Sequence, residues 1–157
     1  MELGNNEVSL AGEFYVLSQL TLRGFIATLT LGNTKSVDIL VADPKSARMF
    51  KVEVKTTIKK PSRDLLFSDE PLYKWTMSKK HEEINDKNLI YCFVNIKDAE
   101  SMPEIFIVPC KHVSEYVKWQ HDFWMKKRNG KDSDVRVFRI KQDEIATYLN
   151  NWKLFVQ

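Results

Sequence analysis

The segment Val37-Asp38-Ile39-Leu40-Val41 and the later segment Phe50-Lys51-Val52-Glu53-Val54-Lys55-Thr56-Thr57 decide the fold that the sequence predicts. Both are rich in apolar and β-branched residues, which is typical of β-strands. Asp43-Pro44 lies between them, and such a pair indicates a turn because proline presets φ for a tight bend. We therefore expect two strands joined by a hairpin, the second of them covering Met49–Thr57.

The second strand has one apolar face and one charged face. Successive side chains of a strand point to opposite sides of the sheet. The charged side therefore carries Lys51, Glu53, Lys55 and Thr57. The hairpin places Asp38 beside Glu53, so that Lys55 supplies one positive charge for two carboxylates. A half-buried carboxylate is costly without a cationic partner, which favours a functional cluster; the alternative is a solvated ion-pair face that contributes little to stability.

An N-terminal helix adds a third carboxylate. Residues 5–23 have the pattern of a helix, which Gly24 ends. Its apolar residues at helical spacing are Leu10, Phe14, Leu17 and Leu20. Glu13 lies within this stripe, so we expect it to approach Asp38 and Glu53 when the stripe packs on the sheet. The alternative is a rotated helix that leaves Glu13 in water.

Three carboxylates around one lysine leave an excess of negative charge. A divalent cation would neutralise it, and ligands that are all oxygen suit Mg²⁺ or Mn²⁺. Such a metal polarises a phosphoryl oxygen and lowers the pKa of bound water, while Lys55 orients that water or stabilises the developing charge. The residue pattern therefore indicates metal-assisted hydrolysis of a phosphodiester.

The rest of the chain predicts a mixed sheet covered by helices. Continuous apolar runs indicate buried strands, and apolar stripes at spacings of three and four indicate helices. Further strands are expected at Phe25–Leu31, Leu89–Ile96, Glu104–Pro109 and Val135–Ile140, with a hairpin loop at Gly32–Lys35. Helices are expected at Tyr73–Asn85, Lys111–Lys127 and Asp143–Trp152, and a surface loop at Pro61–Pro71. The prediction is a single domain of the α/β (α+β) class, with a mixed central sheet flanked by helices.

The charged residues of the first two strands resemble a known motif. Asp38, then fourteen residues, then Glu53-Val54-Lys55, all after a helix that contains Glu13, is similar to the pattern of the PD-(D/E)XK nuclease superfamily. That superfamily includes restriction endonucleases and archaeal Holliday-junction resolvases. The sequence departs from the motif at Val37, where the pattern has proline. The resemblance implies a restriction-endonuclease-like core, αβββαβ, over about residues 4–109, and an extension with a further strand and helices over about residues 110–157.

The same resemblance implies a role for each of the four charged residues. Asp38, Glu53 and Glu13 are the implied ligands of Mg²⁺ or Mn²⁺, and Lys55 is the implied catalytic lysine, so all four are catalytic candidates. The implied activity is that of a metal-dependent endonuclease. Its implied substrate is nucleic acid, with DNA favoured over RNA.

Basic residues gather around this suspected site. The chain has 24 Lys and Arg against 21 Asp and Glu, a net charge of only +3. From Lys45 to Arg63 there are seven basic residues and one acidic residue, a net of +6, whereas the remaining 17 basic and 20 acidic residues give −3. Clustered cations favour a phosphate-bearing partner. The candidate nucleic-acid-binding residues are Lys51, Thr57, Lys59, Lys60, Arg63 and Trp75. The alternatives are a solvated basic loop and a core position for Trp75.

Two other functions are compatible with the sequence: a relative that binds nucleic acid without cutting it, and a protein-interaction module of the defence or immunity type. Cys92 and Cys110 both lie in apolar runs, which indicates reduced core thiols. No apolar run approaches the roughly 20 residues that span a bilayer, and the first residues lack the pattern of a signal peptide. We therefore expect a cytoplasmic protein without membrane association. A duplex substrate would favour a homodimer, because each strand needs its own site.

Overall fold

The strand that carries Glu53 and Lys55 is the central strand of a five-stranded sheet. The computed structural model describes residues 3–30, 37–128 and 131–156, so the predicted hairpin loop at Gly32–Lys35 lies outside the described residues. The sheet has the order β1-β2-β3-β6-β7. Its strands are β1 (Ile26–Leu29), β2 (Ile39–Ala42), β3 (Met49–Thr57), β6 (Leu89–Asn95) and β7 (Glu104–Pro109). Because β3 and β6 run parallel and the other neighbours antiparallel, the sheet is mixed, as predicted.

A second sheet takes the place of a predicted helix. It has the order β4-β5-β8, with β4 at Ser62–Asp64, β5 at Ser68–Ser78 and β8 at Val135–Ile140. The predicted loop at Pro61–Pro71 and helix at Tyr73–Asn85 are therefore wrong, and only a short 3-10 helix, η1 (Lys79–Glu82), follows β5. The reason is a period of two in burial. On one face β5 buries Tyr73, Trp75 and Met77, which suits a strand.

The helices are unequal in length. They are α1 (Asn5–Leu22), α2 (Cys110–Arg128) and α3 (Ile145–Tyr148), with the 3-10 helices η2 (Gln142–Glu144) and η3 (Trp152–Phe155) near the C-terminus. The long helix expected at Lys111–Lys127 is confirmed. The single helix expected at Asp143–Trp152 is wrong, because Asn150 adopts a left-handed φ of 53°, which a continuing helix does not tolerate. No helix in the described part of the chain is long and apolar enough to cross a membrane.

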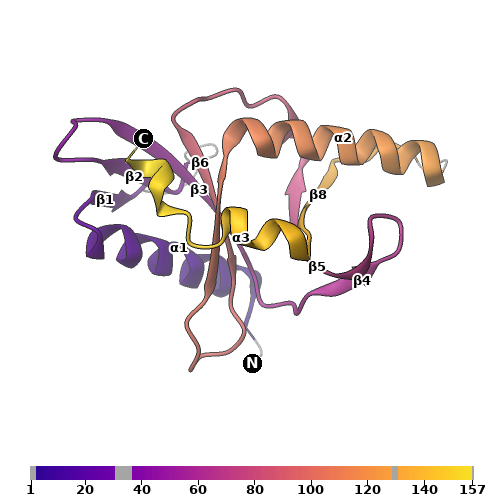
Figure 1. The fold of residues 1–157 in the computed structure, drawn as a ribbon, viewed down its shortest axis with the longest axis horizontal. Coiled ribbons are helices and arrows are strands. Elements are labelled where there is room, and N and C mark those ends of the chain that lie inside the picture. Colours follow the sequence, from indigo (N-terminus) through magenta and orange to yellow (C-terminus); the bar gives the residue numbers. More distant parts are fainter. Residues whose placement is uncertain (1–2, 31–36, 129–130, 157) are drawn as a thin grey trace.

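The five-stranded sheet separates two apolar cores. On one face α1 packs through Val16 and Leu20 onto the β3 residues Val52 and Val54. On the other face α2 and the second sheet cover β6 and β7, and this core includes Tyr91. Figure 1 shows the two long helices, α1 and α2, on different sides of the strands. In this view β4 and β5 lie to the right of β6. This arrangement agrees with the predicted mixed sheet flanked by helices.

The packed face of α1 differs from the predicted stripe. Leu20 is buried, but Leu10 and Phe14 are 48% and 53% exposed. The helix packs instead along a row at every fourth residue, formed by Val8, Gly12, Val16 and Leu20. Gly12 determines this orientation, because a Cβ there would overlap the side chain of Thr56 on β3. The close approach of helix and strand brings the residue after Gly12, which is Glu13, to the border of the contact.

Candidate active site

Asp38 lies where the pairing of β2 with β3 ends. Its backbone N–H donates to the carbonyl of Val52 at 2.8 Å, and its Oδ2 accepts a hydrogen bond from the backbone N–H of Val54 at 2.6 Å. Ile39 and Val52 are the last paired residues, so the carboxylate takes the place of the next backbone acceptor. Asp38 is therefore hydrogen-bonded to Val52 and Val54, the residues on either side of Glu53.

Glu53 is a buried carboxylate with only one satisfied oxygen. The residue is 3% exposed, and its Oε1 accepts a hydrogen bond from Nζ of Lys55 at 2.6 Å. Its Oε2 is buried and has no hydrogen-bond partner among the described residues. A buried polar atom without a partner costs stability and calls for an explanation. This atom fits a ligand that brings positive charge.

Glu13 lies on α1, and its carboxyl group interacts electrostatically with Asp38, Glu53 and Lys55. Burial is the main cause that raises the pKa of its carboxyl group. The negative charge of Asp38 raises this pKa further and that of Glu53 adds to it, while Lys55 opposes them. The structure therefore brings the four predicted catalytic residues into one region, although α1 is rotated from the predicted orientation. We call Glu13, Asp38, Glu53 and Lys55 the Glu53 cluster.

The oxygens of the Glu53 cluster fit a divalent cation that keeps much of its water shell. No group of three or more His, Cys, Asp or Glu side chains within residues 3–30, 37–128 and 131–156 is close enough to hold a metal ion. The three carboxylates therefore do not form a preassembled site. Mg²⁺, however, is usually held by one or two carboxylates and several waters. Glu53 offers one such carboxylate oxygen, the buried Oε2 that has no partner among the described residues.

A cleft of about 910 Å³ opens next to the Glu53 cluster. It is bordered by the start of α1, the C-terminal end of β3 and the strands β5 and β8. The basic residues that line it are Lys55, Lys59, Lys60, Lys74 and Arg139. Arg139 is paired with Asp64 at 2.9 Å, so the lysines carry the excess positive charge. Such a cleft attracts an anionic partner, and phosphate groups in particular.

The predicted nucleic-acid-binding residues lie in different places relative to this cleft. Thr57, Lys59 and Lys60 line it. Lys51 forms an ion pair with Asp86 at 2.9 Å, and it is not among the lining residues. Arg63 is exposed on β4 and also lies outside the lining. Trp75 also borders the cleft, so the lining contains four of the six predicted residues.

Trp75 is a predicted contact that the structure corrects. It is 2% exposed, its Nε1 donates to the carbonyl of Val94 at 2.9 Å, and its ring packs against Phe93 and Phe106. A ring enclosed in this way is not accessible to a nucleobase. Trp75 is a core residue of β5, which agrees with the alternative that the sequence left open.

Sequence reasoning missed four residues at the site. Lys74 and Arg139 line the cleft, and they are paired across β5 and β8. If a strand had been predicted here instead of a helix, the alternation of side chains would have placed Lys74 on the face opposite Trp75. His81 on η1 and Tyr91 on β6 are buried beside Glu53, and no pattern in the sequence connects them with it, because these contacts join separate elements of the fold.

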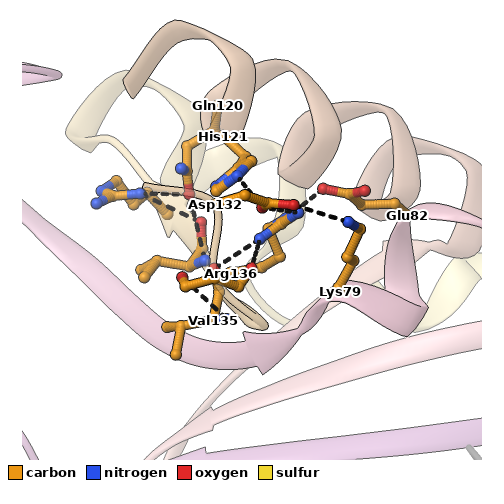
Figure 2. Close-up of polar contacts among 10 residues, drawn as sticks. Lys79, Glu82, Gln120, His121, Asp132, Val135 and Arg136 are labelled. Atoms are coloured by element: carbon orange, nitrogen blue, oxygen red, sulfur yellow. Dashed lines mark hydrogen bonds and ion pairs between the residues drawn. The ribbon is translucent and has the colours of Figure 1, made fainter. Parts of the chain in front are cut away.

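A second charged cluster surrounds the buried Arg136 and joins η1, α2, β8 and the segment just before β8 (Figure 2). Its members are Lys79, Glu82, His121, Asp132 and Arg136, and we call it the Arg136 cluster. Arg136 donates to the Glu82 carboxylate and to two backbone carbonyls at 2.6 and 3.0 Å. Asp132 bonds to Lys79 and His121, each at 2.9 Å, and these bonds lower its pKa to about 2. No buried side-chain polar atom of these five described residues lacks a partner.

Comparisons with known proteins identify the fold. No protein-family model matches the chain, and no curated protein matches it. Among solved structures, the fold is similar to that of the bacterial homing endonuclease I-Ssp6803I, with a TM-score of 0.57 and 12% sequence identity. The match covers 99% of this chain and 95% of the other. The chain therefore shares its overall fold with that endonuclease, and at this identity the likeness extends to the fold alone.

Proposed function

We propose that the protein is a metal-dependent endonuclease of the PD-(D/E)XK type that hydrolyses phosphodiester bonds in DNA. The observation that carries the proposal is the buried Oε2 of Glu53, which has no partner among the described residues, next to Lys55 at the edge of a lysine-lined cleft. The similarity of the fold to that of a homing endonuclease supports it. Asp38, Glu53 and Glu13 are the proposed ligands of Mg²⁺ or Mn²⁺, and Lys55 is the proposed catalytic lysine.

Each residue has a defined part in the proposed reaction. The bound cation would supply Lewis-acid activation of the phosphoryl group and a water of lowered pKa. Asp38 is held in place by the Val54 N–H, and Glu53 by Lys55. Lys55 is 26% exposed in its side chain, so it can reach the substrate and stabilise the charge that develops on the phosphate.

The lysine-lined cleft would bind the phosphate backbone of the substrate. Lys59 and Lys60 are exposed on its wall, and their charges meet phosphates without reading sequence. A duplex substrate would require two sites for cutting both strands, which favours a homodimer. The proposed location is the cytoplasm.

The experiment is a cleavage assay with purified protein, using plasmid, single-stranded DNA, branched DNA and RNA with Mg²⁺ or Mn²⁺. We expect cleavage of DNA that EDTA abolishes and that Asp38→Ala and Lys55→Ala each remove. Cleavage that both variants retain would refute the assignment of the site.

A second candidate function is a relative that binds nucleic acid without cutting it. It is favoured by one observation: the described residues hold no group of three metal-ligating side chains. This candidate predicts no cleavage but binding with a steep negative salt dependence, because neutralised phosphates release counterions. Replacing Lys59 and Lys60 by Ala would then make the slope shallower by about 0.9 for each phosphate that is no longer neutralised. A flat slope would indicate a protein partner instead.

A further inference from the structure

The short segment between β3 and β4 carries two lysines of the cleft wall. Lys59 and Lys60 are both exposed, and both line the cleft. They lie between the end of β3 at Thr57 and the start of β4 at Ser62, so sheet pairing does not fix their orientation. The contacts that hold this backbone therefore determine where the two positive charges lie.

Asn95, the last residue of β6, holds the peptide group between these lysines. Its Nδ2 donates a hydrogen bond to the carbonyl oxygen of Lys59 at 2.9 Å. Asn95 is paired with Thr57 where β3 and β6 run parallel, so its side chain reaches beyond the end of β3. The carbonyl of Lys59 and the nitrogen of Lys60 belong to one rigid, planar unit. A single hydrogen bond therefore restricts the backbone from which both lysine side chains extend.

Neighbouring residues restrict the same segment further. The backbone N–H of Lys59 donates to Oγ1 of Thr57 at 3.2 Å. Lys60 is followed by Pro61, and a residue before proline is restricted to an extended backbone. Both backbone polar groups of Lys59 are thus bonded to side chains, those of Thr57 and Asn95, while its own side chain stays exposed to the cleft.

An asparagine at this position of β6 is unusual for a strand of its kind. The other residues of the strand are Leu, Ile, Tyr, Cys, Phe and Val, and Asn95 is itself only 5% exposed. Asparagine is depleted in strands, and a buried amide is costly unless it is hydrogen-bonded. The requirement that an amide meets here is the hydrogen bond to the Lys59 carbonyl.

We propose that Asn95 is a positioning residue for DNA binding, which holds the Lys59–Lys60 peptide group so that both lysines are presented to the phosphate backbone. This inference rests on the proposed function. Phosphate contacts fix the position of a protein on DNA, and they are stronger when the groups that make them are already ordered before binding. Asn95 provides this order on folding, without contacting the DNA itself.

The test is a double-mutant cycle on the affinity for a short duplex DNA, measured by fluorescence anisotropy in EDTA so that the proposed cleavage does not occur. Asn95→Leu keeps a branched side chain and removes the donor. We expect it to lower affinity about 2- to 10-fold, because roughly one more side chain must be immobilised on binding. In the Lys59→Ala/Lys60→Ala background, Asn95→Leu should have no further effect, since coupled residues are not additive.

The matched control is Asn151→Leu. Asn151 also donates from Nδ2 to a backbone carbonyl, that of Thr147 at 3.1 Å, and it is not among the residues that line the cleft. Its replacement should leave DNA affinity unchanged in both backgrounds. If Asn95 only stabilises the end of the sheet, Asn95→Leu should lower the midpoint of urea unfolding and leave affinity unchanged, or change it equally in both backgrounds. Either outcome overturns the inference.

Two further results decide the remaining cases. If Asn95→Leu does not fold, Thr57→Val takes its place in the cycle, because it removes the oxygen that accepts the Lys59 N–H. A loss of affinity that disappears in the Lys59→Ala/Lys60→Ala background supports the inference, and no loss or a loss that persists there overturns it. Wild-type affinity of the Lys59→Ala/Lys60→Ala variant also overturns it. A wild-type protein that neither binds nor cleaves DNA would refute the proposed function instead.

Discussion

The Glu53 cluster and the Arg136 cluster are both groups of charged side chains within one small fold, but they differ in how completely their atoms are paired. In the Arg136 cluster each buried side-chain polar atom has a partner, and Arg136 alone donates to a carboxylate and two carbonyls. In the Glu53 cluster one buried carboxylate oxygen lacks a partner among the described residues. The first arrangement is what a purely structural network requires. The second carries a cost that folding does not explain, which is expected of a site built for a ligand.

The pKa values of the two clusters shift in opposite directions. Hydrogen bonds from Lys79 and His121 lower the pKa of Asp132 to about 2, so its neighbours stabilise the negative charge. Burial and the charge of Asp38 raise the pKa of Glu13, so its surroundings oppose the negative charge. The residues around the Glu53 cluster therefore leave part of its negative charge without a compensating positive charge.

The largest expected effect is on the fully paired cluster. Arg136→Met leaves the Glu82 carboxylate without its cation, and breaking a buried pair in this way costs about 3–5 kcal/mol of unfolding free energy. Urea unfolding measures the change. Lys111→Met is the control, because Lys111 belongs to an exposed pair on the same helix as His121, and such pairs contribute little. Equal stability of the Arg136 variant and the control would contradict a structural role for this cluster.

Loss of Lys55 should affect catalysis more than stability. Lys55→Met removes the donor to Oε1 of Glu53 and the proposed stabiliser of the transition state, so we expect cleavage to fall by about 100-fold or more. The partly exposed position of Lys55 limits the loss of stability to about 1–3 kcal/mol. Single-turnover cleavage and urea unfolding give the two values. Lys79→Met removes a carboxylate-paired lysine from the Arg136 cluster, and cleavage that falls equally in both variants would mean that the two clusters do not differ in function.

Glu13→Gln should stabilise the protein at neutral pH. Since the folded state raises the pKa of Glu13, ionisation costs stability as the pH rises through the folded value, and glutamine avoids this cost. The gain in Tm should therefore be present at pH 7 and disappear as the pH falls below the ordinary glutamate value of 4.5. Melting curves across the acidic and neutral range measure it.

Asp132→Asn should show the opposite sign. Because the folded state lowers the pKa of Asp132, its ionised form adds stability above the ordinary value of 3.8, and this stability is lost as the pH falls toward about 2. The substitution should lower Tm at pH 7 and have no effect near pH 2. If the Tm at pH 7 changes in the same direction in the Glu13 and Asp132 variants, the two clusters do not differ in their electrostatics as described.

Local patterns in the sequence predict the strands of the site but not every contact that completes it. The alternation along Met49–Thr57 is a local property, and it places Glu53 and Lys55 on one face. The rotation of α1 depends instead on the close contact of Gly12 with Thr56, which no helical stripe reveals. Likewise, His81 reaches Glu53 only because the chain between β3 and β6 forms strands instead of the predicted helix.

The central claim is that the unpartnered oxygen of Glu53 is a metal ligand. The most direct measurement is the Tm of the wild type and of Glu53→Gln, each with and without Mn²⁺, because a ligand that binds only the folded state raises Tm. We predict that Mn²⁺ raises the Tm of the wild type and leaves that of Glu53→Gln unchanged. An equal rise in both proteins would contradict the account.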